Sequence, residues 1–343
     1  MPGAETLSLD AVSLLLVWTA IAVYLLAFIA YTIDLAQRAA RTGAAHEPRQ
    51  TPALVGAFAS TRAQDHDAAE PRTAQHDLHA PPGKRNRLLW ARIGTALTIL
   101  AFLLQLGGTV GRGIAAERVP WANMYEFALT GTLLIVAVYL LALRWYDLRF
   151  LGAFLIGMVV LLLGGATISY YVEVVPLMDP LKSVWLVIHV FVASLATALF
   201  AIACGISITQ LLQARRERRA QASSDVAGNI GPGFLRTLPT ADVLESLAYR
   251  FAIVGFVFWT FTLIAGAIWA NDSWGRYWGW DVKEVWTFVI WVIYAGYIHA
   301  RATRGWRGTR SAWLSITGFV AVLFNFTIVN MFFQGLHAYS GLT

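Results

Sequence analysis

Two histidines in this sequence are placed to bind one metal ion together. His189 lies about five residues inside a long apolar run, or ~7 Å from its end at 1.5 Å per helical residue, and His337 closely follows the last apolar run. If successive runs cross a membrane in alternate directions, both histidines lie near one surface. A neutral imidazole nitrogen is a common metal ligand. We therefore expect His189 and His337 to share a metal, although a histidine in a membrane helix can also be a simple hydrogen-bonded contact.

A tryptophan-rich run lies between two apolar segments at the same predicted surface. Residues 274–281 read Trp-Gly-Arg-Tyr-Trp-Gly-Trp-Asp. The indoles can cover a flat ligand and the glycines let the backbone approach it: Trp274, Trp278, Trp280, Gly275 and Gly279. An interfacial aromatic belt explains scattered residues such as Trp18, Trp90 and Trp145, but such a belt requires neither glycines nor an acid. A flat ligand whose iron binds two imidazoles is heme, so heme b is the predicted ligand.

Charged residues in and beside this run could orient the ligand. Arg276 or Lys283 could pair with the heme propionates. Asp281 could orient a histidine ligand or a tryptophan N–H. We therefore predict that His189, His337 and Asp281 carry the chemistry, and that Arg276 belongs with the heme-binding residues.

His299 is too far away to share the same iron. It lies 18 residues beyond Asp281, which is about 27 Å along a helix. If it is an iron ligand, it belongs to a second, inner site, and a partner protein would have to supply the other imidazole. It could equally be a helix-end histidine beside Arg301 and Arg304, favoured by the helix dipole.

The elements that position these residues are predicted to be membrane-spanning helices. The chain has 343 residues, of which 57% are hydrophobic and 13% charged, which is too apolar for an ordinary soluble domain. A helix needs about 20 apolar residues to cross the hydrocarbon core. We predict an all-α, polytopic membrane protein with about eight spans: 11–33, 88–106, 122–143, 150–169, 184–212, 250–270, 282–300 and 312–333.

Lysine and arginine predict the orientation of these spans. They gather in segments 34–87, 144–149, 213–250 and 301–311, which should face the cytoplasm. Both termini and the tryptophan-rich run then face outward. The net charge of +6 therefore reflects membrane topology, and we expect no nucleic-acid partner.

The chain divides into three predicted parts. Residues 1–33 form an N-terminal span, which we interpret as a retained helix because it lacks the features of a cleaved signal peptide. Residues 34–87 are predicted to be a disordered cytoplasmic linker. Residues 88–343 form a membrane domain of seven spans, with the external loop at 271–286. Residues 213–240 look like a second linker, and 240–250 could form a short amphipathic helix on the inner surface.

Cysteine content limits the chemistry. Cys204 is the only cysteine and lies within a predicted span. One thiol cannot shuttle a disulfide alone, and the chain has no CxxCH motif for attaching heme to itself.

At this point the sequence resembles a known family. Residues 274–286 resemble the WWD signature of heme-handling proteins, and the chain from residue 88 onward resembles the CcsA/ResC branch of system II cytochrome c biogenesis, often named CcsB in actinobacteria. The matching segments outside the signature are 118–126, 185–189, His299 and 335–337. The WWD run alone also occurs in the system I proteins CcmC and CcmF, but the span layout and the three histidines favour CcsA.

The resemblance implies roles for these residues. His189 and His337 would be the axial ligands of heme displayed under the WWD loop, and His299 would pair with a histidine of the membrane partner ResB, often called CcsB outside actinobacteria. Asn123, Tyr125 and Glu126 match the family pattern, and we assign them no role beyond the outer cavity.

The implied function is heme transport to the outer surface and covalent heme attachment to the CxxCH motif of apocytochrome c. The protein would be an enzyme component, a holocytochrome c synthase active with its partner and with a separate, thioredoxin-like thiol reductant. A bacterial plasma membrane is the expected location, and a plastid thylakoid is the second choice. One alternative is a WWD-family heme exporter or chaperone without ligation activity, as in CcmC or CcmF. Another is a secondary transporter for an unrelated solute.

Overall fold

The computed structural model describes residues 8–44, 89–222, 232–303, 305–333 and 335–337, and within these residues it contains helices and no strand. The long helices are α1 Leu9–Ala44, α3 Leu89–Ala115, α4 Met124–Ala142, α5 Gly152–Tyr170, α6 Val184–Ala222, α7 Ala241–Trp274, α8 Val282–Thr303 and α9 Thr309–Phe324. The short elements are η2 Arg149–Leu151, η3 Asp179–Lys182, η4 Gly233–Thr237, a π-helix η5 at Asn325–Val329, and α10 Asn330–Phe332. The all-α prediction is therefore confirmed.

Seven of the described segments are long and apolar enough to cross a membrane: α1, α3, α4, α5 with η2, α6, α7, and the run from α9 to α10. The eighth predicted span is α8, which has 22 residues and packs beside α7 and α9. Lys283 and Glu284 at its start and Arg301 at its end lower its hydropathy. The protein is therefore a polytopic membrane protein.

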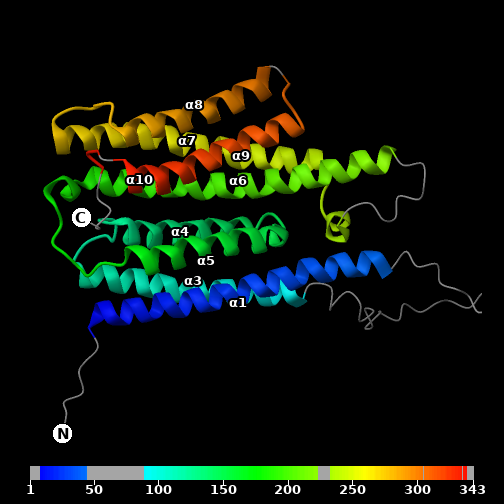
Figure 1. The fold of residues 1–343 in the computed structure, drawn as a ribbon, viewed down its shortest axis with the longest axis horizontal. Helices are drawn as coiled ribbons and strands as arrows, with labels where there is room; N and C mark the ends of the chain where they lie inside the picture. The colour runs from blue at the N-terminus through cyan, green and yellow to red at the C-terminus, as the bar shows by residue number, and fades with distance from the viewer. Residues whose placement is uncertain (1–7, 45–88, 223–231, 304, 334, 338–343) are drawn as a thin grey trace, which may run out of the picture.

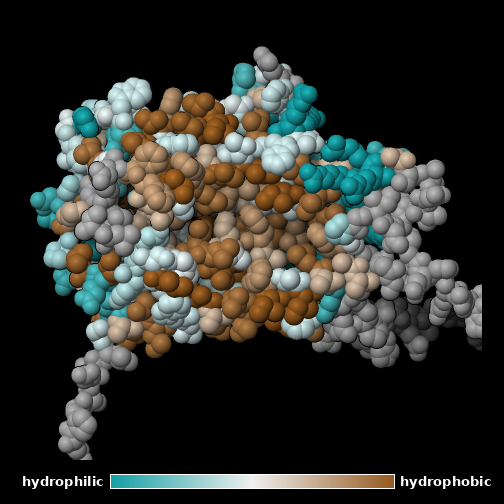
Figure 2. Space-filling view, viewed as in Figure 1, coloured by the Kyte–Doolittle hydropathy of each residue, from teal (hydrophilic) through white to brown (hydrophobic). Residues whose placement is uncertain are grey.

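The helices run side by side along the long axis of the molecule (Figure 1). Helix α1 packs against α3, while α6 packs against α7 and α9. Helices α4 and α5 lie between these two groups, and α8 covers α7 and α9 from outside. Hydrophobic side chains cover the middle of the bundle and hydrophilic ones gather toward its ends, as Figure 2 shows, which matches a membrane-spanning bundle.

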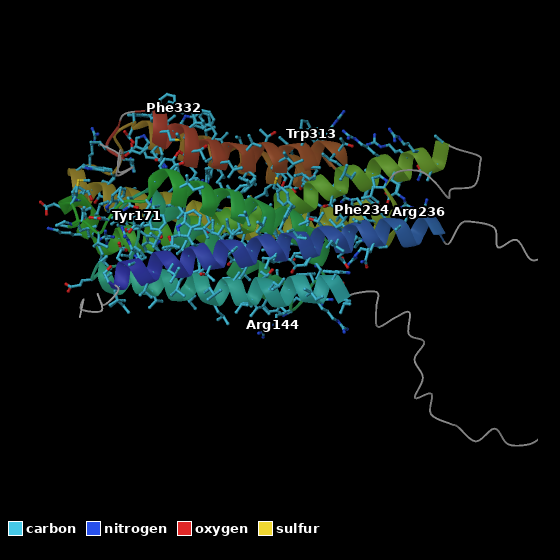
Figure 3. All side chains as sticks on the ribbon, turned by 60° about the horizontal axis from the view of Figure 1, so that its bottom comes forward. Arg144, Tyr171, Phe234, Arg236, Trp313 and Phe332 are labelled. Atoms are coloured by element: carbon cyan, nitrogen blue, oxygen red, sulfur yellow. The ribbon has the colours of Figure 1, made fainter. Side chains whose placement is uncertain are left out.

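The two ends of the bundle differ in the segments that they carry. One end gathers the start of α1, residues 116–123, residues 171–183 and the tryptophan-rich segment between α7 and α8 (Figure 1). Figure 3 places Tyr171 and Phe332 toward this end and Arg236 toward the other. The arginine-rich ends of α6 and α8 also lie at that other end. The predicted separation of the tryptophan-rich segment from the basic segments is therefore seen in the fold.

Several helices continue past their predicted boundaries because charged residues beyond the apolar runs find partners. Helix α1 extends to Ala44, past the boundary predicted at residue 33, and buried Asp34 pairs with Arg38 at 2.6 Å. The later part of the predicted linker 34–87 and its histidines lie outside the described residues. Helix α6 extends to Ala222, so its basic cluster is helical and not part of a linker.

The separate amphipathic helix predicted at 240–250 is wrong. Helix α7 is continuous from Ala241 to Trp274. Its first turns pack into the bundle because Glu245 is buried there, where it accepts hydrogen bonds from Arg301 Nε at 3.1 Å and from the Gly308 N–H at 2.6 Å. These bonds tie the start of α7 to the connection between α8 and α9.

Candidate functional site

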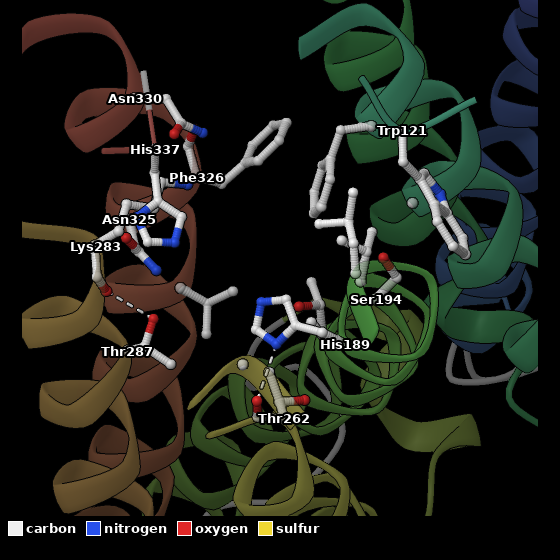
Figure 4. Close-up of a pocket in the computed structure, with 18 of the residues that line it drawn as sticks. Trp121, His189, Ser194, Thr262, Lys283, Thr287, Asn325, Phe326, Asn330 and His337 are labelled. Atoms are coloured by element: carbon white, nitrogen blue, oxygen red, sulfur yellow. Dashed lines mark hydrogen bonds between the residues drawn. The ribbon is translucent and has the colours of Figure 1, made fainter. Parts of the chain in front are cut away.

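A cavity of about 230 Å³ lies among α4, α6, α7, α8 and η5. His189 and His337 both line it, as the sequence predicted for a shared site (Figure 4). Its walls are mostly apolar, and the Trp278 and Tyr277 side chains contribute from the tryptophan-rich segment. Two segments that lie far apart in the sequence thus meet at one cavity.

The imidazole of His189 is fixed by helix α7. Its Nδ1 lies 2.9 Å from the backbone carbonyl oxygen of Thr262. Because a carbonyl oxygen can only accept, Nδ1 carries the hydrogen and donates it, and Nε2 keeps a free lone pair. The Trp269 indole stacks on the ring at 5.9 Å between centroids and 20° between planes. His189 is therefore held in the tautomer that a metal at Nε2 requires.

The imidazole of His337 is fixed by Asp281. The Nδ1–H group donates to Asp281 Oδ2 at 2.7 Å, and the Leu336 N–H donates to Oδ1 at 3.0 Å. Gly335 packs so closely against this carboxylate that a β-carbon there would collide with Oδ1. The hydrogen bond from His337 holds the pKa of Asp281 below its ordinary value of 3.8, so the carboxylate is ionised at neutral pH. A carboxylate behind a histidine is a recurrent way to orient a metal ligand.

One indole contacts both histidine rings. Trp269 stacks on His189 and meets the His337 ring edge-on, with 5.3 Å between centroids. The two distances, 5.9 and 5.3 Å, limit the separation of the imidazole centroids to at most about 11.2 Å. Trp269 is itself held by a hydrogen bond from Nε1 to the Pro180 carbonyl oxygen at 2.8 Å. Trp269 was not among the predicted site residues, although it lies about one and a half helical turns before the predicted motif.

The loop that carries the motif is closed by the first turn of α8. Asp281 caps this turn, because its Oδ2 accepts from the Lys283 N–H at 3.3 Å. Glu284 Oε2 accepts from the N–H groups of Asp281 at 3.0 Å and Gly279 at 2.8 Å. An acid at the cap with a glutamate three residues later is a capping box. Buried Glu284 was missed, and the spacing of Asp281 and Glu284 is the signal that could have found it.

The three predicted indoles play different parts. Trp274, at the end of α7, meets His337 edge-on at 5.0 Å, and Trp278 lines the cavity. Trp280 is 76% exposed, has a positive φ of 59° and does not line the cavity, so its contact with the ligand stays a prediction. Gly275 ends α7 with φ of 70° and donates to the Asn271 carbonyl oxygen, a conformation for which glycine is best suited. The regular helices leave only residues 275–281 as loop, fewer than the predicted 271–286.

The two cations proposed for the propionates also differ. Lys283 lines the cavity, whereas Arg276 is exposed and does not. The Arg276 guanidinium lies against Gly279, where a β-carbon would collide with it. Of the two, Lys283 has the position suited to an acidic ligand group.

His299 lies far from the cavity, near the opposite end of α8. Its side chain is exposed on the surface of the bundle. The structure thus separates His299 from His189 and His337, as the helix length predicted.

The cavity also has a polar wall that was not predicted from the sequence. Asn325 belongs to the π-helix, a rare element that often marks functional sites, and Asn330 follows it. Figure 4 shows both beside His337, Lys283 and Thr287. Buried Asn325 Oδ1 and, from α6, Ser194 Oγ have no hydrogen-bond partner within the described residues. Two unpaired polar atoms on a largely apolar cavity suit an amphipathic ligand.

Asn123, Tyr125 and Glu126 now have structural roles. Asn123 lines the cavity and caps α4 by accepting from the Glu126 N–H at 2.9 Å. Glu126 is fully buried and pairs with Arg112 at 3.0 Å and Arg118 at 2.6 Å. Arg112 also pairs with Asp10 of α1 at 2.6 Å, and Tyr125 packs beside this network. These ion pairs join α1, α3 and α4 at the end of the bundle that carries the cavity.

His189 and His337 could supply two imidazole ligands to one iron. Within the described residues, no group of three or more His, Cys, Asp or Glu side chains is placed to hold a metal. Two imidazoles suffice for heme, because the macrocycle supplies the other four ligands.

Comparisons with known proteins identify the family. Residues 121–337 match the family described as cytochrome C assembly protein. The cytochrome c biogenesis protein CcsA of Gloeobacter violaceus is 31% identical over 296 residues, covering 73% of this chain and 87% of that protein. CcsA of Guillardia theta is 34% identical over 261 residues, covering 73% and 86%. The solved structure of the cytochrome c heme lyase CcmF shares the fold, with a TM-score of 0.59 and 16% identity over 95% of this chain, which spans about half (48%) of CcmF.

The family match covers both histidines of the cavity, the motif and Asp281, and the relatives are matched over most of their own length. The chain therefore belongs to the cytochrome c assembly protein family, as a CcsA-type protein of system II cytochrome c biogenesis.

Proposed function

We propose that this protein carries heme to the outer surface of the membrane and holds it for covalent attachment to apocytochrome c. The observation that carries the proposal is the pair of imidazoles on one cavity, each with Nδ1 hydrogen-bonded to an acceptor and each in contact with Trp269. This arrangement leaves both Nε2 atoms available to one iron. The bacterial plasma membrane is the proposed location, with the cavity on its outer side.

The cavity residues suit heme as a substrate in three ways. The apolar walls and Trp278 can cover the macrocycle and exclude water. Lys283 and the asparagines of the polar wall can receive the propionates. Asp281 orients the His337 ring through Nδ1, which leaves Nε2 as the nitrogen that can bind the iron.

The reaction is the addition of two cysteine thiols of the CxxCH motif to the two heme vinyl groups. Each sulfur forms a C–S bond to one vinyl carbon, and the thiol hydrogen ends on the other carbon, so no net oxidation occurs. The histidine of CxxCH replaces one axial imidazole, which brings the cysteines beside the vinyl groups. The protein contributes orientation, because the reactivity belongs to the substrate groups.

His337 is the axial ligand better suited to this exchange. It lies on the short segment 335–337 after α10, whereas His189 lies within α6. Cys204 is buried and single, so a thioredoxin-like protein must keep the substrate thiols reduced. Exposed His299 can meet a histidine of a ResB-type partner at an inner heme site.

Absorption spectra of the purified protein test the site. The wild type made with ample heme should show low-spin bis-imidazole bands. His189→Ala and His337→Ala should each lose these bands, and added imidazole should partly restore them. Unchanged spectra in both variants would remove the proposed site.

Co-expression separates ligation from transport alone. The protein, the ResB-type partner and a CxxCH substrate are produced together, and covalent heme is detected on the denatured cytochrome. We expect thioether-linked heme only when this chain is present. Heme transfer without thioether bonds would instead support the exporter or chaperone.

A further inference from the structure

We propose that one face of α7, formed by Thr262, Gly266 and Trp269, positions His189 for iron binding, and that Gly266 is its critical member. The inference rests on the proposed function, and it assigns positioning roles to residues outside the tryptophan-rich motif. The three residues are spaced i, i+4 and i+7, so they lie on one side of the helix. This side faces α6, where His189 is located.

Each of the three residues fixes a different property of the imidazole. The Thr262 carbonyl oxygen accepts the Nδ1–H group at 2.9 Å and so selects the tautomer. Trp269 stacks on the ring at a 20° angle and fixes its plane. Gly266 fixes how closely the ring approaches helix α7, because the ring lies directly over the position that a β-carbon would take.

The fit at Gly266 is tight enough to test. A β-carbon at this position would lie 2.7 Å from His189 Cε1 and 2.8 Å from Nδ1. Ordinary van der Waals contacts begin near 3.4 Å, so the ring would have to move by several tenths of an ångström. The ring is also held by the Thr262 carbonyl oxygen, and the stacked Trp269 is itself tied to Pro180 by a hydrogen bond. An alanine therefore displaces the imidazole from its carbonyl partner, from the iron, or from both.

Two other glycines provide matched controls. A β-carbon added at Gly255, on the same helix, would lie 2.7 Å from Phe200 Cε1 of α6. Gly255→Ala therefore creates a similar steric conflict between α6 and α7, but at residues that do not line the cavity. A β-carbon added at Gly296 of α8 would have no atom within 4 Å, so Gly296→Ala adds a methyl group without conflict. Gly255→Ala reports general loosening of α6 from α7, and Gly296→Ala reports the neutral case.

The experiment is hemin titration of the purified full-length variants, followed by absorption and electron paramagnetic resonance spectra. We expect Gly266→Ala to weaken hemin binding by about 10- to 100-fold, the range typical for residues that orient a metal ligand, and to lose low-spin signal. Added imidazole should restore that signal. Gly255→Ala and Gly296→Ala should bind hemin as the wild type does. In a His189→Ala background, Gly266→Ala should cause no further loss, because the displaced ring is gone.

The outcomes separate this inference from the proposed function. If His189→Ala leaves the wild-type spectrum unchanged, the proposed function and this inference both fall. Two outcomes overturn only the positioning role when the spectrum does depend on His189. In the first, Gly266→Ala binds hemin as tightly as Gly296→Ala. In the second, Gly255→Ala loses as much hemin affinity as Gly266→Ala. If Gly266→Ala does not fold, Trp269→Leu removes the stacked ring without adding a conflict. It should then weaken hemin binding at least several-fold and change the low-spin signal, and wild-type behaviour would overturn the inference.

Discussion

Replacement of Asp281 by asparagine should weaken the support of His337 while keeping the size of the side chain. The carboxylate uses both oxygens: Oδ1 accepts from the Leu336 N–H, and Oδ2 accepts from His337 Nδ1 and the Lys283 N–H. An amide has one acceptor oxygen, so its NH₂ group must face either His337 or Leu336, both of which donate. At least one of these contacts is lost in either orientation.

The cost follows from the kind of bond that is lost. The pair is largely buried, with 7% of the Asp281 side chain and 19% of the His337 side chain exposed. A hydrogen bond to a charged group contributes about 1.5–3 kcal/mol, and each 1.4 kcal/mol is a factor of about ten in affinity. Asp281→Asn should therefore weaken hemin binding by about 10- to 100-fold. The Lys283 N–H that caps α8 shares Oδ2 with His337, so the cap is kept only when the amide oxygen faces both of these groups, and the Leu336 contact is then lost.

Hemin titration with a parallel thermal unfolding curve measures both effects. The control is Asp179→Asn, which removes an exposed carboxylate in the segment 171–183 and should leave hemin binding unchanged. In a His337→Ala background, Asp281→Asn should add little further loss. Wild-type affinity in Asp281→Asn, or an equal loss without His337, would refute the reasoning.

Four further outcomes are expected. Asp281 stabilises the folded protein while it is ionised, because its pKa is lower in the folded state than in the unfolded state. This contribution is present above pH 3.8 and is lost as the pH falls through the lower, folded-state pKa. Unfolding curves recorded below pH 4 should show the loss in the wild type and not in Asp281→Asn. Glu126→Gln should lower the free energy of unfolding by about 3 kcal/mol, because Arg118 and Arg112 lose a buried partner; an unchanged melting temperature would contradict this. Glu284→Ala should weaken hemin binding about tenfold by releasing the loop, whereas Glu284→Gln should not, since its carbonyl oxygen can accept the same N–H groups. Trp280→Gly should be about 1 kcal/mol more stable than Trp280→Ala, because glycine tolerates positive φ, and equal unfolding curves would exclude strain there.

The membrane helices could be predicted because hydropathy is a local property of the sequence. Their true ends could not, since these depend on partners elsewhere in the chain. Asp34 and Glu245 each lie at the edge of an apolar run, yet each is buried and each has an arginine partner, at Arg38 and Arg301. A charge therefore marks the end of a span only when it lacks such a partner.

The site could be predicted in part, for a similar reason. Residue type and membrane depth were enough to predict that His189 and His337 lie near each other, and both line one cavity. The groups that orient them were missed, because Thr262 acts through its backbone carbonyl and Gly266 through the absence of a side chain. Trp280 shows the opposite case. It belongs to the motif, but it is exposed, has a positive φ and does not line the cavity.

The π-helix at Asn325–Val329 has a consequence for how the last segment can vary. A π turn holds about one residue more than an α turn, and one residue corresponds to about 100° of rotation around a helix axis. Because the extra residue is held within this turn, deleting one residue there should leave a regular α turn and keep the direction of the following segment, whereas deleting one residue from α9 should turn that segment by about 100°. The π-helix is therefore the place where the end of the chain best tolerates a change in length of one residue.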